Sequence, residues 1–156
     1  MPSAPIRETD DEARTLARDI LAAARFAAIA TTHPDTGHPH VTRIALCLCD
    51  GRLLALISDL STHAKALIQA PDCSLLIGEP GPRGDPLTHP RLTLAARAVF
   101  LPDKSDRANY LAAIPKAKLY IDFGDFRFVR FDIGAVDLNG GFGRAYRLKP
   151  ADLFPD

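Results

Sequence analysis

The feature that most constrains this fold is a series of short apolar runs bounded by turn residues. In residues 91–101 alternate side chains are apolar, which is the period of a β-strand with one buried face. Residues 40–49 and 52–58 form two further apolar runs, separated only by Asp50-Gly51. Because this dipeptide is typical of two-residue hairpin turns, the two runs are predicted to pair as antiparallel strands.

The other periodic segments predict the remaining strands and three helices. Strands are expected over 26–32, 73–78, 126–138 and 144–148, and helices over 10–25, 61–70 and 102–114. Asp10 or Asp11 is expected to cap the first helix and Asp103 the third. The alternation slips between Phe128 and Val129, which predicts a bulge or a strand buried on both faces. Together these elements predict an α+β fold on an antiparallel barrel of about six strands.

Composition narrows the class of protein. The 156 residues are 47% hydrophobic, so we expect a single domain over 1–156, with a loose lead-in at 1–9. No apolar run approaches about 20 residues, and no membrane span is expected. The 19 basic and 19 acidic residues balance, which argues against a duplex nucleic-acid binder. Three cysteines without C-x-x-C spacing, and an N-terminus without a signal sequence, predict a cytoplasmic protein.

The start of the short helix at 61–70 is a candidate phosphate site. Lys65 lies in its first turns, where the helix dipole disfavours a cation. The same turn offers Ser61, Thr62 and His63 together with free backbone N–H groups, and Ser58 ends the preceding strand. Hydroxyls, a cation and a helix N-terminus together predict phosphate binding. The alternative is that Ser61 only caps the helix and Lys65 points into water.

Arg43 strengthens the phosphate interpretation. On its strand it shares a face with small or apolar neighbours, where a guanidinium needs an anionic partner. Counted from the Asp50-Gly51 turn, Arg43 falls opposite or just beyond Ser58, so the two are expected to converge on one ligand. A buried ion pair between Arg43 and a carboxylate is the alternative.

A glycine-rich bend near the C-terminus is a second candidate ligand site. Asn139–Gly143 contains three glycines, whose backbone can approach a planar ligand closely. Arg144 follows and can hold an anionic group or lie in solvent. The segment is not a dinucleotide-binding fingerprint, because too few residues follow it for a βαβ unit.

Other polar residues give weaker signals. His38 and His40 are predicted on one strand face, with His33 across the turn, but no set of carboxylates or thiolates accompanies them, and no metal site is assigned. Cys47 and Cys49 are expected to fill the core. The chain has no motif for hydrolysis or phosphoryl transfer. Any chemistry is therefore expected to come from a cofactor.

Three stretches resemble one known family. They are 43–46 with the following 56–67, then 84–94, and finally 120–126 with 139–145. The chain resembles the pyridoxamine 5'-phosphate oxidase-like FMN-binding split barrels, and most closely their haem-utilisation branch. The resemblance implies an antiparallel, Greek-key-like split barrel with short flanking helices. Haem-degrading members of that branch carry a further C-terminal domain, which this chain is expected to lack.

The resemblance also implies a site and a partner. Arg43 and Lys65 match residues that hold the FMN phosphate in such barrels, and the flavin of the family lies between two subunits of a homodimer. The residues expected to contact the cofactor are Arg43, Ser58, Ser61, Thr62, His63, Lys65, Arg91 and Arg144. The first hypothesis is therefore an FMN-dependent oxidoreductase acting on an unassigned small molecule.

Two other hypotheses remain open. One is a haem-binding protein without flavin chemistry, which would use the segment 140–144 and a histidine ligand such as His33, His38, His40 or His89. The other is a dimeric scaffold whose site has degenerated, because a fold does not guarantee a function.

Overall fold

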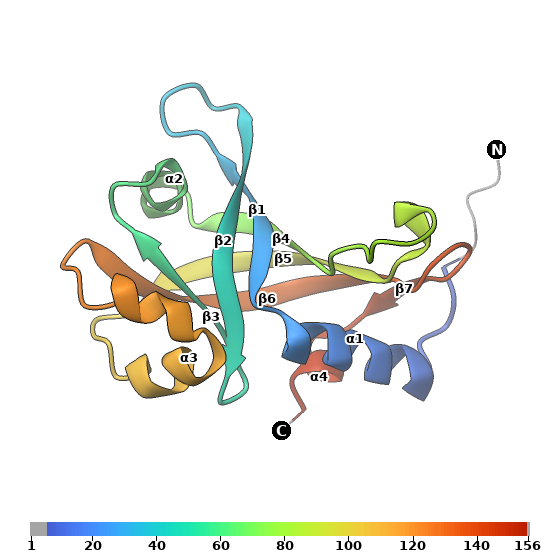
Figure 1. Ribbon diagram of the computed structural model, residues 1–156. Coiled ribbons are helices and arrows are strands. Elements are labelled where there is room, and N and C mark those ends of the chain that lie inside the picture. Colours follow the sequence, from blue (N-terminus) through green and yellow to red (C-terminus); the bar gives the residue numbers. More distant parts are fainter. Residues whose placement is uncertain (1–5, 156) are drawn as a thin grey trace.

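The computed structural model describes residues 6–155 and has seven strands in one antiparallel sheet. In chain order they are β1 (Phe26–Thr32), β2 (Pro39–Cys49), β3 (Arg52–Ser58), β4 (Asp72–Ile77), β5 (Arg91–Phe100), β6 (Phe126–Asn139) and β7 (Ala145–Leu148). The sheet order is β3-β2-β1-β4-β5-β6-β7, and β3 also pairs with β6. This extra pairing closes six strands into a barrel, and β7 continues the sheet beyond it (Figure 1). The order β4-β1-β2-β3 is a Greek key, so the predicted α+β split barrel is confirmed.

Within residues 6–155, six helical segments lie around the barrel. They are α1 (Asp11–Ala23), α2 (Thr62–Gln69), η1 (Pro86–Thr88), α3 (Arg107–Ala113), η2 (Pro115–Leu119) and α4 (Pro150–Leu153). The Asp10 side chain caps α1 by accepting from the Ala13 N–H. The prediction that Asp103 caps the third helix is wrong. Asp103 accepts from the Ser105 N–H in a turn ahead of α3, which begins only at Arg107.

Two hydrophobic cores lie on opposite sides of β3. Its residues Leu53 to Ile57 are all buried. Leu53, Ala55 and Ile57 face the barrel interior with α1 and α2, whereas Leu54 and Leu56 pack beneath α3 and η2. An unbroken apolar run is the pattern expected of a strand that is covered on both faces.

The slip in alternation on β6 also arises because the strand is buried on both faces. Phe128 and Val129 are both buried, the first in the core under α3 and the second inside the barrel. The β-bulge lies further along, where Ala95 pairs with Ala135 but Ala96 pairs with Ile133, which leaves Gly134 without a partner. Of the two predicted explanations, burial on both faces is therefore correct at this position.

The N-terminal lead-in is not loose where it is described. Arg7 forms a parallel bridge with Tyr146, and its N–H donates to the Ala145 carbonyl at 2.8 Å. The Thr9 hydroxyl donates to the Arg147 carbonyl. Residues 6–9 thus extend the sheet edge at β7, and the rest of the predicted lead-in, 1–5, lies outside the described residues. None of the described helices is long and apolar enough to cross a lipid bilayer.

Candidate functional site

The turn between β3 and α2 uses its two serines to organise itself. The Ser61 hydroxyl caps α2 by accepting from the Ala64 N–H at 3.2 Å, and it donates to the Ser58 carbonyl at 2.7 Å. The Ser58 hydroxyl accepts from the Leu60 N–H and donates to the carboxylate of Asp125. Both predicted site serines therefore stabilise the turn. Each hydroxyl already donates its hydrogen within the protein, so neither can donate to a ligand.

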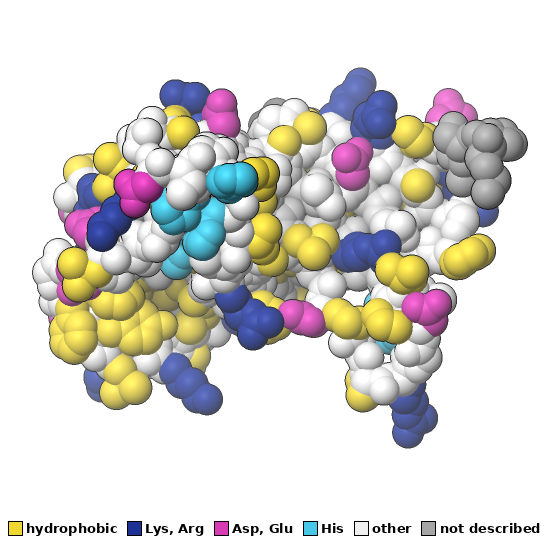
Figure 2. Space-filling view, turned by 90° about the horizontal axis from the view of Figure 1, so that it is seen from above, with side chains coloured by type: hydrophobic (Ala, Val, Ile, Leu, Met, Phe, Trp, Pro, Cys, Tyr) yellow, Lys and Arg dark blue, Asp and Glu magenta, His cyan; other side chains and the backbone are white. Residues whose placement is uncertain are grey.

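His63 is also engaged, through a neighbouring strand. Its Nδ1 lies 3.0 Å from the hydroxyl of Thr42 on β2. Burial of the ring lowers the pKa of His63, and the nearby His40 lowers it further. The imidazole is therefore neutral near pH 7, and its contact with Thr42 fixes α2 against β2 next to Arg43. Figure 2 shows His side chains gathered on this part of the surface.

Several donors at the start of α2 remain unsatisfied. The first N–H groups of an α-helix have no acceptor within the helix, and those of Thr62 and His63 have none elsewhere in residues 6–155. The exposed Lys65 ammonium makes no ion pair within the same residues. Two backbone N–H groups and a cation at one helix terminus are suited to an anion. Of the predicted phosphate residues here, Thr62, His63 (through its N–H) and Lys65 keep that capacity.

Arg43 does not lie opposite Ser58, so the predicted register is wrong. The β2–β3 ladder ends where Leu46 pairs with Ala55. Beyond that point Arg43 pairs with Ala28 of β1, and Ser58 pairs with Phe126 of β6. The two strands part because each acquires a different second neighbour as the barrel closes, and simple counting from the hairpin does not detect this.

Arg43 faces a groove on the outer side of the sheet. The groove has a volume of about 620 Å³ and lies between α1, β1, β4 and the loop of residues 79–90. The Arg43 guanidinium lies 5.6 Å from the ring centroid of Phe26 and, among the described residues, has no carboxylate partner. Arg43 is exposed, so the predicted alternative of a buried ion pair is wrong. Leu76 and Leu87 supply apolar walls.

Arg91 and His89 hold the loop at the edge of this groove. Arg91 donates to the carbonyls of Leu87 and His89, both at 3.2 Å. The two ring nitrogens of His89 bind the Gly81 N–H and the Arg83 carbonyl. With both nitrogens engaged, His89 is not a free ligand for a haem iron in this conformation.

The structure does not bring Arg144 to either part of the site. It follows a bend in which Gly141, at φ +120°, lies close to the Thr88 carbonyl. Arg144 lines neither the groove nor the α2 terminus. Within residues 6–155 no three His, Cys, Asp or Glu side chains are grouped to hold a metal ion.

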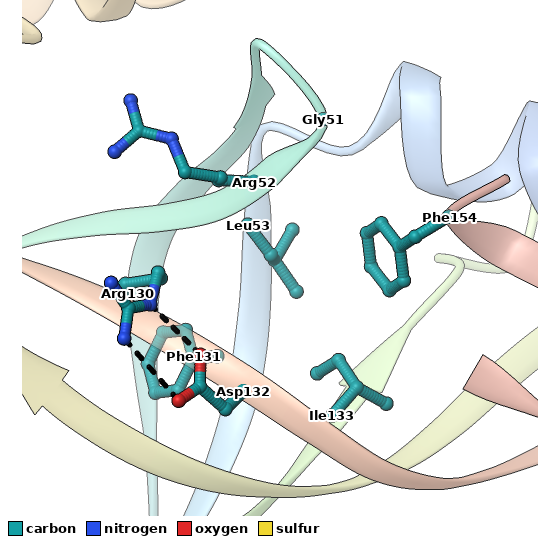
Figure 3. Close-up of a pocket in the computed structure, with 8 residues that line it drawn as sticks. All are labelled: Gly51, Arg52, Leu53, Arg130, Phe131, Asp132, Ile133 and Phe154. Carbon is teal, nitrogen blue, oxygen red and sulfur yellow. Dashed lines mark hydrogen bonds and ion pairs between the residues drawn. The ribbon is translucent and has the colours of Figure 1, made fainter. Parts of the chain in front are cut away.

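A smaller hollow lies at the closed end of the β2–β3 hairpin (Figure 3). Its volume is about 230 Å³, and Leu53, Ile133 and Phe154 face it. Its two arginines are already paired. Arg130 binds Asp132 through two hydrogen bonds of 2.8 and 3.3 Å, and Arg52 pairs with Asp106. The hollow therefore lacks the unpaired cations that distinguish the groove.

Sequence reasoning missed three residues of the site. Phe26 lies beneath the Arg43 guanidinium, Thr42 positions α2 through His63, and Asp125 holds Ser58. A signal for Asp125 was present, because it lies in the stretch 120–126 that resembles the family. No local pattern pointed to Thr42 or Phe26, because their roles arise from pairing between β1 and β2.

Comparisons with known proteins support the barrel fold. The profile of the family described as Pyridoxamine 5'-phosphate oxidase matches residues 14–140. A curated relative, the non-canonical heme oxygenase HOZ, chloroplastic, of Arabidopsis thaliana, is 38% identical over 104 residues. That match covers 64% of this chain and 31% of the relative, so this chain spans under a third of HOZ.

Two solved structures are similar over nearly the whole chain. One is 48% identical, with a TM-score of 0.86 over 95% of this chain and 99% of its own. The other, a heme binding protein from Mycobacterium smegmatis, is 29% identical with a TM-score of 0.82, over 96% of this chain and 61% of its own. With a family match over most of its length and the closed six-stranded barrel, the chain belongs to the pyridoxamine 5'-phosphate oxidase family.

Proposed function

We propose that the chain binds flavin mononucleotide and is a flavin-dependent oxidoreductase acting on a small molecule. The observation that carries this proposal is the unpaired Arg43 guanidinium beside Phe26 in an apolar groove. An arginine that is held over an aromatic ring, and that has no carboxylate partner within residues 6–155, is suited to a phosphate, which a guanidinium can bind through two N–H groups.

The residues present fit both parts of such a cofactor. Arg43 in the groove, and Lys65 with the N–H groups of Thr62 and His63 at the start of α2, are each suited to the phosphate, because none has a competing acceptor within residues 6–155. No residue of α2 lines the groove, so the proposal requires the phosphate to lie between the two parts. Apolar side chains such as Leu76 and Leu87 are suited to the ring system. A bound flavin would supply the hydride or electron transfer. The chain itself would orient the ring and exclude water, and we assign no side chain as a general acid or base.

A second copy of the chain is the partner in this proposal. The outer face of β1, β2 and β4 leaves Val41 66%, Leu76 45% and Phe26 41% exposed. Phe26 and Leu76 border the groove. Exposed apolar surface marks interaction sites, and a second subunit would cover the groove. The proposal also includes a cytoplasmic location, which the three free, buried cysteines favour.

Haem is a second candidate ligand because of two relatives. The 38% identical protein is a heme oxygenase and the 29% identical structure is a heme binding protein. In the groove, Arg43 and Arg91 would have to bind the haem carboxylates. His89 is the histidine that lines the groove, and its nitrogens are engaged. A haem bound there would therefore lack a histidine ligand unless the loop opened.

The experiment that separates these candidates is a pair of titrations, of FMN followed by fluorescence and of haemin followed by absorbance. Loss of one charge-assisted contact to a phosphate is expected to weaken FMN binding about 10- to 100-fold in Arg43→Ala and in Lys65→Ala. Arg97→Ala is the matched control, because Arg97 is an exposed arginine paired with Asp72. Unchanged FMN affinity in both site variants contradicts the proposal, and haemin binding without FMN binding favours the second candidate.

A further inference from the structure

The loop of residues 79–90 forms one wall of the groove. Separate hydrogen bonds hold its first half, 79–84, and its second half, 85–90. The second half is held by Asp85, whose carboxylate accepts from the Leu87 N–H at 2.9 Å, and by Arg91, which donates to the Leu87 carbonyl. Pro86 and Leu87 in this half line the groove, and Leu87 is 60% exposed. The apolar tip of the loop is thus presented to whatever occupies the groove.

The first half of the loop is held by a single ring. His89 Nδ1 lies 3.1 Å from the Gly81 nitrogen, and Nε2 lies 2.8 Å from the Arg83 carbonyl. A backbone N–H only donates and a carbonyl only accepts. The contacts therefore require a bare Nδ1 and a protonated Nε2, which is one tautomer of the neutral imidazole. Apart from these two contacts, neither the backbone nor the side chains of residues 79–84 make a hydrogen bond within residues 6–155.

Protonation is incompatible with this arrangement. In the imidazolium both nitrogens are donors, so Nδ1–H would face the Gly81 N–H and the contact would be lost. Histidine takes up a proton between about pH 8 and pH 5. The charged groups of the loop and the groove are Arg83 and Asp85 on the loop, with Arg25, Arg43, Glu79 and Arg91 along the groove. Cations outnumber carboxylates in this set.

We propose that His89 is a pH-sensitive latch that keeps the first half of the 79–90 loop closed while its imidazole is neutral. Protonation releases Gly81, the first half of the loop swings free, and the part of the groove wall formed by Glu79 and Pro80 opens. The opening of the loop stands on the His89 contacts alone. Its consequence for a ligand rests on the proposed function, because it requires the groove to be the binding site.

Hydrogen exchange tests the latch without any ligand. The protection factor of the Gly81 amide, corrected for the intrinsic pH dependence of exchange, is expected to fall at least about tenfold between pH 7.5 and pH 5.5 in the wild-type chain. His89→Gln cannot titrate, and its carboxamide oxygen can still accept from Gly81, so its protection should not change with pH. His38→Gln is the control, because the His38 ring makes no hydrogen bond within residues 6–155 and should leave the wild-type profile intact.

The same pH series with FMN bound tests the gate. Release of FMN, followed by stopped-flow fluorescence, should accelerate at least about fivefold on acidification in the wild type and in His38→Gln, but not in His89→Gln. Gly81 protection that is independent of pH in the wild type, or equally dependent on pH in His89→Gln, overturns the latch. If protection follows the prediction while FMN release does not, the latch stands and its role as a gate is overturned. If FMN does not bind at all, the proposed function fails and the exchange result still decides the latch.

Discussion

Gly78, at the end of β4, allows the groove loop to leave the barrel. Its φ is +113°, and a Cβ placed on it would lie 2.6 Å from the Pro90 carbonyl oxygen and 2.9 Å from the Arg91 Cα. Both neighbours are backbone atoms, which cannot move aside without shifting β5. Gly78→Ala should therefore displace the loop from the strand that anchors it.

The size of this effect follows from two contributions. A side chain at positive φ costs about 1–2 kcal/mol, and overpacking against fixed backbone costs about 1–3 kcal/mol. Gly78→Ala should thus lower the free energy of unfolding by about 3 kcal/mol. Gly84→Ala in the same loop is the matched control, because it has φ +79° and nothing within 4 Å of the added Cβ. It should show only the first contribution, about 1 kcal/mol.

Urea denaturation followed by circular dichroism measures both variants. The reasoning predicts that Gly78→Ala is the more destabilised by about 2 kcal/mol, with an unchanged m-value. Equal losses in the two variants would refute it, because the close approach of Pro90 and Arg91 would then have no energetic consequence.

Three further predictions concern buried groups. Tyr110 is fully buried, its hydroxyl has no hydrogen-bond partner within residues 6–155, and burial raises its pKa. Tyr110→Phe should therefore be neutral or raise the free energy of unfolding by about 1 kcal/mol, as measured by thermal melting, and a clear loss of stability would contradict this. Burial raises the pKa of the Cys47 and Cys73 thiols to about 12, so mass spectrometry should find neither alkylated by iodoacetamide at pH 8 until urea is added. Burial lowers the pKa of His63 in the folded state, so the unfolded chain binds more protons as the pH falls. The contribution of His63 to the free energy of unfolding is therefore complete above about pH 6.5 and is lost as the pH falls below it. His63→Gln should flatten this dependence in urea midpoints between pH 8 and pH 5, and an unchanged slope would assign it to other groups.

Local pattern predicted most of the barrel. The Asp50-Gly51 hairpin, the alternation of β5 and the capping of α1 by Asp10 each depend on residues that are close in sequence. The closure of the barrel through β3 and β6 could not be derived in this way, because it joins residues about 70 positions apart, such as Ser58 and Phe126. The strand pattern predicted a barrel but did not predict which two strands close it.

In the candidate site too, features that depend on local sequence were predictable, and features that depend on distant pairing were not. The start of α2 at Thr62 and its cap Ser61 were predictable, since helix capping is a local property. That Thr62 and Lys65 bind a phosphate stays a prediction. The position of Arg43 was predicted wrongly because the hairpin register does not persist past Leu46. The groove itself could not be foreseen, because α1 and the 79–90 loop meet there only after folding.

The pairing of Ser58 with Asp125 shows how a hydroxyl that is predicted to contact a ligand can instead support a turn. A hydroxyl near a phosphate-binding turn has two uses, contact with the ligand or support of the turn. The sequence does not distinguish them, whereas the hydrogen bond to a carboxylate from a distant turn does. Ser58→Ala should accordingly affect the stability of the turn before it affects a ligand.

The most direct test of the central claim compares FMN with riboflavin, which lacks the phosphate. The account places the cationic groups Arg43 and Lys65 on that phosphate. Fluorescence titrations of the wild-type protein should therefore give FMN at least about a 100-fold lower Kd than riboflavin, and the difference should shrink in Arg43→Ala. Equal affinity for the two flavins, or no binding of either, would contradict the account.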